Sequence, residues 1–189
     1  MNLSPSDQFI GKYQNSGRIG QLLIERFFMA ARRLLDPALG AAPRVLEVGC
    51  GPGYSTERIN GWRSTGQFVA GEPEWEMLEH ARAVNSGIRF ICESVYGLPH
   101  PDNSFDGVIM LEVLEHLEDP SAALAELHRV SRGVVLISTP REPMWRALNC
   151  ARGKYLADLG NTPGHIQHWS NRGLMRQVSP LFEVIGCAK

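Results

Sequence analysis

The chain has 189 residues, of which 43% are hydrophobic and 21% are charged, a balance typical of a soluble globular domain and not of a disordered segment. Nineteen basic and twenty acidic residues give a formal net charge of −1, so the chain lacks the excess positive charge of a nucleic-acid-binding protein. No apolar run approaches the ~20 residues that a membrane-spanning helix needs, and the N-terminus lacks the apolar stretch of a signal peptide.

The cysteines point to a reducing environment. Cys50, Cys92, Cys150 and Cys187 form no C-x-x-C pair, which argues against a zinc ribbon and against a disulfide framework. Together with the net charge and the absence of a long apolar run, this predicts a cytoplasmic protein that has no membrane contact and does not bind nucleic acid.

The N-terminal part of the chain predicts one amphipathic helix after a polar lead-in, residues 1–17. Apolar residues recur with helical spacing from Arg18 to Leu35, and a proline and a glycine soon end the pattern. We expect residues 1–42 to form a helical cap.

Residues 43–140 alternate between short apolar strands and amphipathic helices. The pattern predicts strands at RVLEVGC, QFVAGE, IRFICE, FDGVIML and GVVLIST, with helices at TERINGW, EWEMLEHARAV and PSAALAELHRV. Apolar, β-branched strands separated by helices favour an α/β fold, with a doubly wound, mostly parallel Rossmann-like sheet and helices on both of its faces.

The C-terminal part is less regular. Residues 141–172 hold several prolines and glycines and predict a lid or substrate segment. Residues 173–189 are expected to complete a last helix, NRGLMRQV, and to add a last strand, FEVIGCA. The whole chain, residues 1–189, is thus expected to be one domain whose sheet has six or seven strands.

The first predicted strand ends in a glycine-rich turn, VLEVGCGPGYS. Gly49, Gly51 and Gly53 let the backbone turn sharply and approach a ligand closely. Tyr54 stands where the dinucleotide fingerprint would have its third glycine. Glu47 would repel a pyrophosphate, so the combination favours a ligand with a positive charge; an ordinary tight turn between strand and helix is the alternative.

Carboxylates also follow the next two strands. Glu72 ends the second strand, where an acidic residue commonly holds both hydroxyls of a ribose. A solvated glutamate beside Pro73 at a helix start is the alternative. Glu93 and Ser94 follow the third strand, where they could bond to the edge of an adenine.

The run VLEVGCGPG, then Glu72, then LPHPDNSFDGVIMLEVLEHLEDP resembles the class I S-adenosylmethionine-dependent methyltransferases of type 11, over about residues 43–140. The resemblance implies that the glycine loop cradles the methionine part of S-adenosylmethionine, that Glu72 holds the ribose, and that Glu93 or Ser94 holds the adenine. The chain departs from the family pattern in its SRG turn before the fifth strand and in lacking a visible seventh strand. The cofactor-binding residues expected on this basis are Glu47, Gly49, Cys50, Gly51, Gly53, Glu72, Pro73, Met77, Glu93, Ser94 and Leu111.

After the fourth strand, the stretch MLEVLEHLEDP places Glu112, Glu115 and His116 at spacings that a helix would bring to one face. One interpretation is electrostatic: the glutamates favour the positive N-terminus of a helix, and His116 packs locally. A second interpretation makes His116 or another histidine a general base.

A third interpretation is a divalent metal, such as Mg²⁺ or Zn²⁺, bound by Glu112, Glu115 and His116. The stretch TPGHIQHWS adds His165 and His168 as candidates for a fourth ligand. This pattern is similar to that of the ubiquinone-biosynthesis O-methyltransferases and the small-RNA 2′-O-methyltransferases, and alignment with them favours His165. His116 and His165 are therefore the expected catalytic residues.

The resemblance implies methyl transfer to a small-molecule acceptor, with oxygen favoured as the acceptor atom. The alternative is a non-catalytic module that binds S-adenosylmethionine or a partner through a methyltransferase-like fold. An unfinished sheet edge is also a plausible place for a second copy to pair, which would give a homodimer.

Overall fold

The computed structural model describes residues 17–62, 65–141, 144–151, 153, 158–162 and 164–188. The predicted lead-in therefore lies outside the described residues, apart from Gly17. None of the described helices is both long enough and apolar enough to cross a membrane.

The centre of the molecule is a five-stranded sheet in the order β3-β2-β1-β4-β5, and every neighbouring pair is parallel. Its strands are β1 (Arg44–Val48), β2 (Gln67–Gly71), β3 (Arg89–Ile91), β4 (Phe105–Leu111) and β5 (Ser131–Ser138). The strand order reverses between β1 and β4, and sheets of this type bind ligands beyond the carboxyl ends of the strands at such a point. The predicted α/β class is confirmed.

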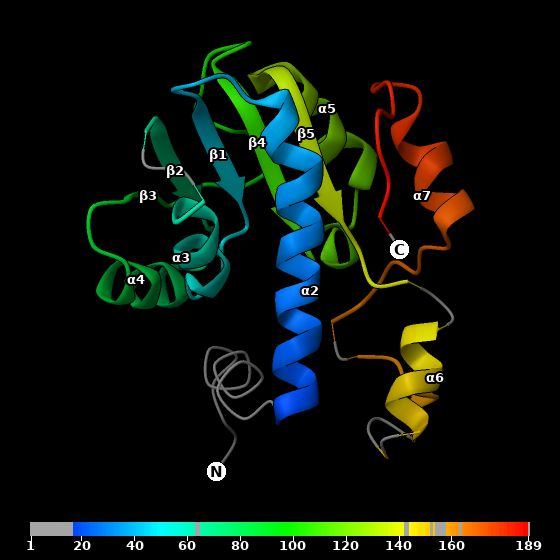
Figure 1. Cartoon of the computed structure of the whole chain (residues 1–189). Helices are drawn as coiled ribbons and strands as arrows, with labels where there is room; N and C mark the ends of the chain where they lie inside the picture. The colour runs from blue at the N-terminus through cyan, green and yellow to red at the C-terminus, as the bar shows by residue number, and fades with distance from the viewer. Residues whose placement is uncertain are drawn as a thin grey trace.

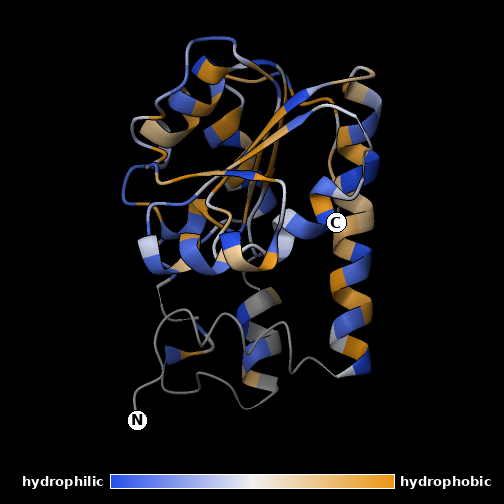
Figure 2. Cartoon of the chain, turned by 90° about the vertical axis from the view of Figure 1, so that its left-hand side faces the viewer, coloured by the Kyte–Doolittle hydropathy of each residue, from blue (hydrophilic) through white to orange (hydrophobic). Residues whose placement is uncertain are grey.

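Helices cover both faces of the sheet (Figure 1). The described helices are α2 (Arg18–Leu35), α3 (Tyr54–Asn60), α4 (Trp75–Val84), α5 (Pro120–Val130), α6 (Met144–Ala151) and α7 (Asn171–Val178), with 3₁₀ turns η1 (Asp36–Ala38) and η2 (Leu114–His116). Figure 2 shows that hydrophobic residues concentrate in the central strands, whereas the helices alternate in hydropathy.

Two hydrophobic clusters lie on opposite faces of the sheet. Val108 belongs to the cluster that α5 covers, and its neighbour Ile109 belongs to the cluster that α2 covers; both are fully buried. Successive side chains of a strand point to opposite faces, so a strand covered on both faces must be apolar throughout. This explains why the central strands are continuous apolar runs.

The prediction of a sixth strand at FEVIGCA is wrong. Residues 182–188 form no strand, and the described sheet has five strands rather than six or seven. Phe182 packs against α5, Gly186 lies close to α2, and Ile185 is 72% exposed. A strand exists only where another backbone pairs with it, and an apolar pattern alone cannot supply that partner.

The segment 141–172 contains a helix that the sequence pattern did not predict, α6. Figure 1 shows α6 and the N-terminal half of α2 beyond the edge of the sheet where the strands end. Any ligand bound at the carboxyl ends of the strands would therefore lie on the side of the sheet from which these two helices project.

Candidate functional site

The glycine loop begins where β1 ends, and three of its glycines have positive φ. The angles are 74° at Gly49, 53° at Gly51 and 87° at Gly53, and glycine adopts such angles without steric cost. A Cβ at Gly53 would lie 2.9 Å from the Cα of Ala81 on α4, whereas a Cβ at Gly51 would meet nothing within 4 Å. Gly53 is thus required by packing, and Gly51 borders open space.

Glu47 is 1% exposed and fixes the helix that follows the loop. Its two carboxylate oxygens accept hydrogen bonds from Ser55 Oγ at 2.5 Å and from Thr56 Oγ1 at 2.7 Å. Burial raises the pKa of Glu47 to about 7, although both hydroxyls act in the opposite direction. The carboxyl that we expected to face a ligand is therefore bonded within the protein.

Glu72 reaches from the end of β2 to the glycine loop. Its Oε2 accepts from the backbone N–H of Gly51 at 2.9 Å, and its Oε1 accepts from that of Glu74 at 3.1 Å. Burial raises the pKa of Glu72, against the effect of these two bonds. Pro73 is exposed beside it, and Met77 is half-buried in α4. The carboxylate thus lies at the edge of the open space next to Gly51.

Glu93 is buried, and its carboxylate lies beside His100. Its Oε2 lies 2.9 Å from Nε2 of His100, and its side chain fills the space where Gly71 lacks a Cβ. Burial raises the pKa of Glu93 to about 7, in spite of a nearby arginine. Burial and three nearby arginines lower the pKa of His100. Of the two residues predicted at the adenine, Ser94 is the exposed one.

Glu112 follows Leu111 at the end of β4 with a φ of 55°, which is uncommon for a residue other than glycine. Its N–H donates to the carbonyl of Ser138 at 3.2 Å, and its Oε1 accepts from Ser138 Oγ at 2.7 Å. Glu112 therefore joins the ends of β4 and β5. The positive φ keeps it out of the following turn, η2, so the helical face predicted for Glu112 with Glu115 and His116 does not form.

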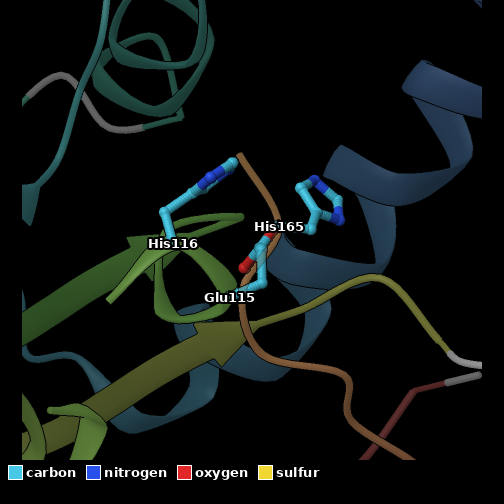
Figure 3. A group of neighbouring side chains, drawn as sticks. All are labelled: Glu115, His116 and His165. Atoms are coloured by element: carbon cyan, nitrogen blue, oxygen red, sulfur yellow. The ribbon is translucent and has the colours of Figure 1, made fainter. Parts of the chain in front are cut away.

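Glu115, His116 and His165 gather in one group, in which one possible ligand atom from each lies within 4.8 Å of the others. Figure 3 shows Glu115 and His116 on the turn after β4 and His165 on the segment that faces them. Glu115 is 1% exposed, and the two histidines are half-buried, with ring centroids 4.8 Å apart. A carboxylate and two imidazoles match the ligand set of zinc, whose tetrahedral ligands lie about 3.3 Å apart. The ligand atoms would have to approach one another by up to about 1.5 Å around an ion.

Backbone hydrogen bonds bring His165 to this group. The N–H groups of Ile166 and Gln167 both donate to the carbonyl of Glu115 at 3.0 Å, and the carbonyl of Gly164 lies 2.8 Å from Nδ1 of His116. A carbonyl can only accept, so this contact places the proton of a neutral His116 on Nδ1 and its lone pair on Nε2. His168, the other candidate, is exposed and is not a member of the group.

Sequence reasoning missed the hydroxyl partners of the site. Ser55 and Thr56 follow the glycine loop directly, and two adjacent hydroxyls at a helix start near a buried carboxylate are a signal that could have identified them. Ser138, the partner of Glu112, lies on another strand, and no local pattern identifies it.

Comparison with known proteins finds methyltransferases among the relatives of this chain. Residues 46–137 match the family described as "Methyltransferase domain". An uncharacterized methyltransferase of Schizosaccharomyces pombe is 39% identical over 47% of this chain and 36% of its own length. The malonyl-[acyl-carrier protein] O-methyltransferase of Erwinia pyrifoliae is 34% identical over 63% of this chain and 46% of its own length. The demethylmenaquinone methyltransferase of Renibacterium salmoninarum is 33% identical over 66% of this chain and 54% of its own length. The chain thus spans about a third to a half of the length of these relatives.

Solved structures share the fold at lower identity. A chain of the Haloferax volcanii complex that contains the Trm112 methyltransferase activator has a TM-score of 0.68 at 17% identity, covering 96% of this chain and 77% of that one. The [4+2]-cyclase SpnF has a TM-score of 0.67 at 21% identity, covering 89% of this chain and 61% of its own.

Proposed function

Because the chain belongs to the class I S-adenosylmethionine-dependent methyltransferases, we propose that it transfers the methyl group of S-adenosylmethionine to an oxygen atom of a small-molecule acceptor. The observation that supports this most directly is the Glu115–His116–His165 group, which begins after the end of β4. Because β4 runs parallel to β1, and β1 leads into the glycine loop, the group and the loop follow the same edge of the sheet. The net charge of −1 gives no support to a long nucleic acid as acceptor.

The open space beside Gly51 is the proposed place of the methionine part of the cofactor. Gly51 has no side chain to occupy this space, and Glu72 reaches it from β2. On binding, the Glu72 carboxylate would accept from the ribose hydroxyls, and Ser94 would contact the adenine. The roles of Pro73 and Met77 beside the ribose, and of the Leu111 backbone at the amino-acid end, stay predictions.

The histidines supply the proposed acid–base chemistry. S-adenosylmethionine, when bound, presents a methyl group on a positively charged sulfur, and a hydroxyl acceptor must lose its proton as it attacks. Nε2 of His116 is the candidate base, because the Gly164 carbonyl fixes the proton on Nδ1. The buried Glu115 carboxylate would stabilise the imidazolium that results.

Metal-assisted transfer is a second candidate, favoured by the ligand chemistry of the same group. Glu115, His116 and His165 would bind the ion, and an ion there would lower the pKa of an acceptor hydroxyl. Glu112, which the sequence also predicted as a ligand, bonds to Ser138 instead. In this candidate His116 binds the ion and does not act as the base.

A non-catalytic module is the alternative from another class. The fold of this chain is also that of SpnF, which is named as a cyclase, and of a chain in a complex with an activator protein. A fold of this kind therefore does not by itself imply methyl transfer. Pairing of a second copy along an unfinished sheet edge, which would give a homodimer, stays a prediction.

Two measurements test the proposal. Titration calorimetry should detect binding of S-adenosylhomocysteine, and the purified chain should convert S-adenosylmethionine to S-adenosylhomocysteine when a small-molecule extract supplies acceptors. Binding without turnover across fractionated extracts would favour the non-catalytic module. The absence of binding to either ligand would contradict both. Loss of turnover on chelation, with binding retained, would select the metal-assisted form.

A further inference from the structure

Two side chains of α6 bond the helix to the loop that follows it. Asn149, which is 2% exposed, donates from Nδ2 to the carbonyl of Gly160 at 2.9 Å and to Thr162 Oγ1 at 3.3 Å. Arg146 donates from Nε to the carbonyl of Leu159 at 3.1 Å. Gly160 has a φ of 79°, and a Cβ there would clash with the Arg146 carbonyl. The loop therefore lies directly against α6.

The same loop leads into His165. The N–H of His165 donates to the carbonyl of Thr162 at 3.1 Å, and Nδ2 of Asn161 donates to the carbonyl of His165 at 3.3 Å. The residues after His165 bond to the backbone of Glu115. His165 is thus held on one side by the loop bonded to α6 and on the other side by the turn that bears Glu115 and His116.

Apolar packing contributes little to the position of this loop. Leu159 is 71% exposed, and Ile166, on the other side of His165, is 53% exposed. A loop whose described apolar side chains are exposed depends on hydrogen bonds for its position, and those made in a buried environment are the most costly to lose. The hydrogen bonds of Asn149 are buried and join the described part of the loop to α6.

We propose that Asn149 is a positioning residue for His165: it sets the place of the imidazole ring in the Glu115–His116–His165 group without being a member of that group. The inference rests on the proposed function, because the role of His165 is part of it. Loss of the Asn149 amide would remove the buried bonds between the loop and α6 and let His165 move away from Glu115 and His116. The effect on cofactor binding would be small, because the glycine loop lies on another strand.

The chain offers a matched control, Asn85, which is another buried asparagine. Its Nδ2 donates to the carbonyl of Gly53 at 3.0 Å and to that of Ala81 at 3.1 Å, so it supports the glycine loop. Replacing either asparagine by leucine removes a buried amide donor and keeps the branched shape of the side chain, with two methyl groups in place of the amide oxygen and nitrogen. The two variants should therefore affect different parts of the site. Asn149→Leu should displace His165, and Asn85→Leu should weaken cofactor binding.

The experiment uses the full chain with ¹³C-labelled histidine and Co²⁺ alone as the metal probe. The His165 ring signal is assigned from its loss in His165→Gln. We expect Asn149→Leu to shift that signal and to weaken Co²⁺ binding about tenfold, the lower end of the range for residues that orient metal ligands. Affinity for S-adenosylhomocysteine should be unchanged. Asn85→Leu should leave the His165 signal in place and weaken S-adenosylhomocysteine binding.

An unchanged His165 signal in folded Asn149→Leu would overturn the inference. If the original chain binds no Co²⁺, the metal-assisted candidate fails, and the ring signal alone decides the role of Asn149. If Asn149→Leu does not fold, Asn149→Asp gives the same test, because it keeps the shape of the side chain and replaces the donating Nδ2 by a carboxylate oxygen, which cannot donate to Gly160 or Thr162. A shifted His165 signal in that variant would support the inference, and an unshifted one would contradict it.

Discussion

Two alanine substitutions in the glycine loop should separate packing from cofactor binding. Gly51 and Gly53 both have positive φ, so alanine at either position costs about 1 kcal/mol of unfolding free energy for the backbone alone. At Gly53 the new Cβ would also lie 2.6 Å from Asn85 Nδ2 and 2.9 Å from Ala81 Cα, whereas at Gly51 nothing lies within 4 Å. Overpacking of this kind costs about 1–3 kcal/mol more.

For a chain of this size, about 1 kcal/mol corresponds to about 2–4 °C in the unfolding temperature. Gly53→Ala should therefore unfold several degrees below Gly51→Ala in a thermal scan followed by circular dichroism. Gly51→Ala should lose less stability than Gly53→Ala. It should nevertheless bind S-adenosylhomocysteine more weakly than the original chain does, because its methyl group enters the space proposed for the methionine part. Equal unfolding temperatures for the two variants, or full affinity in Gly51→Ala, would refute this reasoning.

Three further predictions concern charged groups of the site. Glu72→Gln should weaken S-adenosylhomocysteine binding by about 1–3 kcal/mol in calorimetry, since it removes charge-assisted bonds to the ribose; unchanged affinity would contradict the assignment. Burial raises the pKa of Glu47 to about 7 from 4.5, so the folded state binds more protons between these values, and the stabilisation present below pH 4.5 is lost as pH rises to about 7. The shift corresponds to at most about 3 kcal/mol, and urea unfolding at pH 5 and pH 8 should differ less in Glu47→Gln than in the original chain. His116→Ala and His165→Ala should each reduce turnover by about 10²–10⁴-fold, whereas exposed His168→Ala should retain most of it.

Helices α5 and α7, which the sequence predicted with exact bounds, carry local signals at their ends. Asp119 caps α5 by accepting from the N–H of Ala122 at 3.0 Å, and Pro120 occupies the first position of that helix. Ser170 caps α7 in the same way, accepting from the N–H of Gly173 at 3.1 Å. These signals lie within a few residues of the helix end, so no tertiary information is needed to recognise them.

The elements that were predicted wrongly or missed depend on contacts between distant residues. The apolar pattern of residues 182–188 resembles a strand, but pairing requires a neighbouring backbone that the sequence does not reveal. Glu93 follows a strand as predicted, yet its buried contact with His100 decides the direction of its side chain. Helix α6 has only eight residues and follows two prolines, and these prolines suggested a loop.

The histidine group was predicted partly for a reason that the structure does not support. A helical face was to unite Glu112 with Glu115 and His116, but the positive φ of Glu112 separates it from the turn. Glu115 and His116 are close because one 3₁₀ turn contains both, and His165 reaches them through backbone bonds to that turn. The three residues converge through one short turn and one long-range loop.

This arrangement divides the site into two parts that rest on different supports. The glycine loop and Glu72 are held at the ends of β1 and β2, whereas His165 is held by the loop bonded to α6. Substitutions in parts that share no contacts change free energies nearly additively. Changes between residues 158 and 167 should thus alter turnover and leave cofactor affinity intact, and changes at Glu72 should do the reverse. Coupling between a substitution at Glu72 and one at Asn149, measured as non-additive cofactor affinities in the double variant, would mean that α6 and the cofactor loop move together.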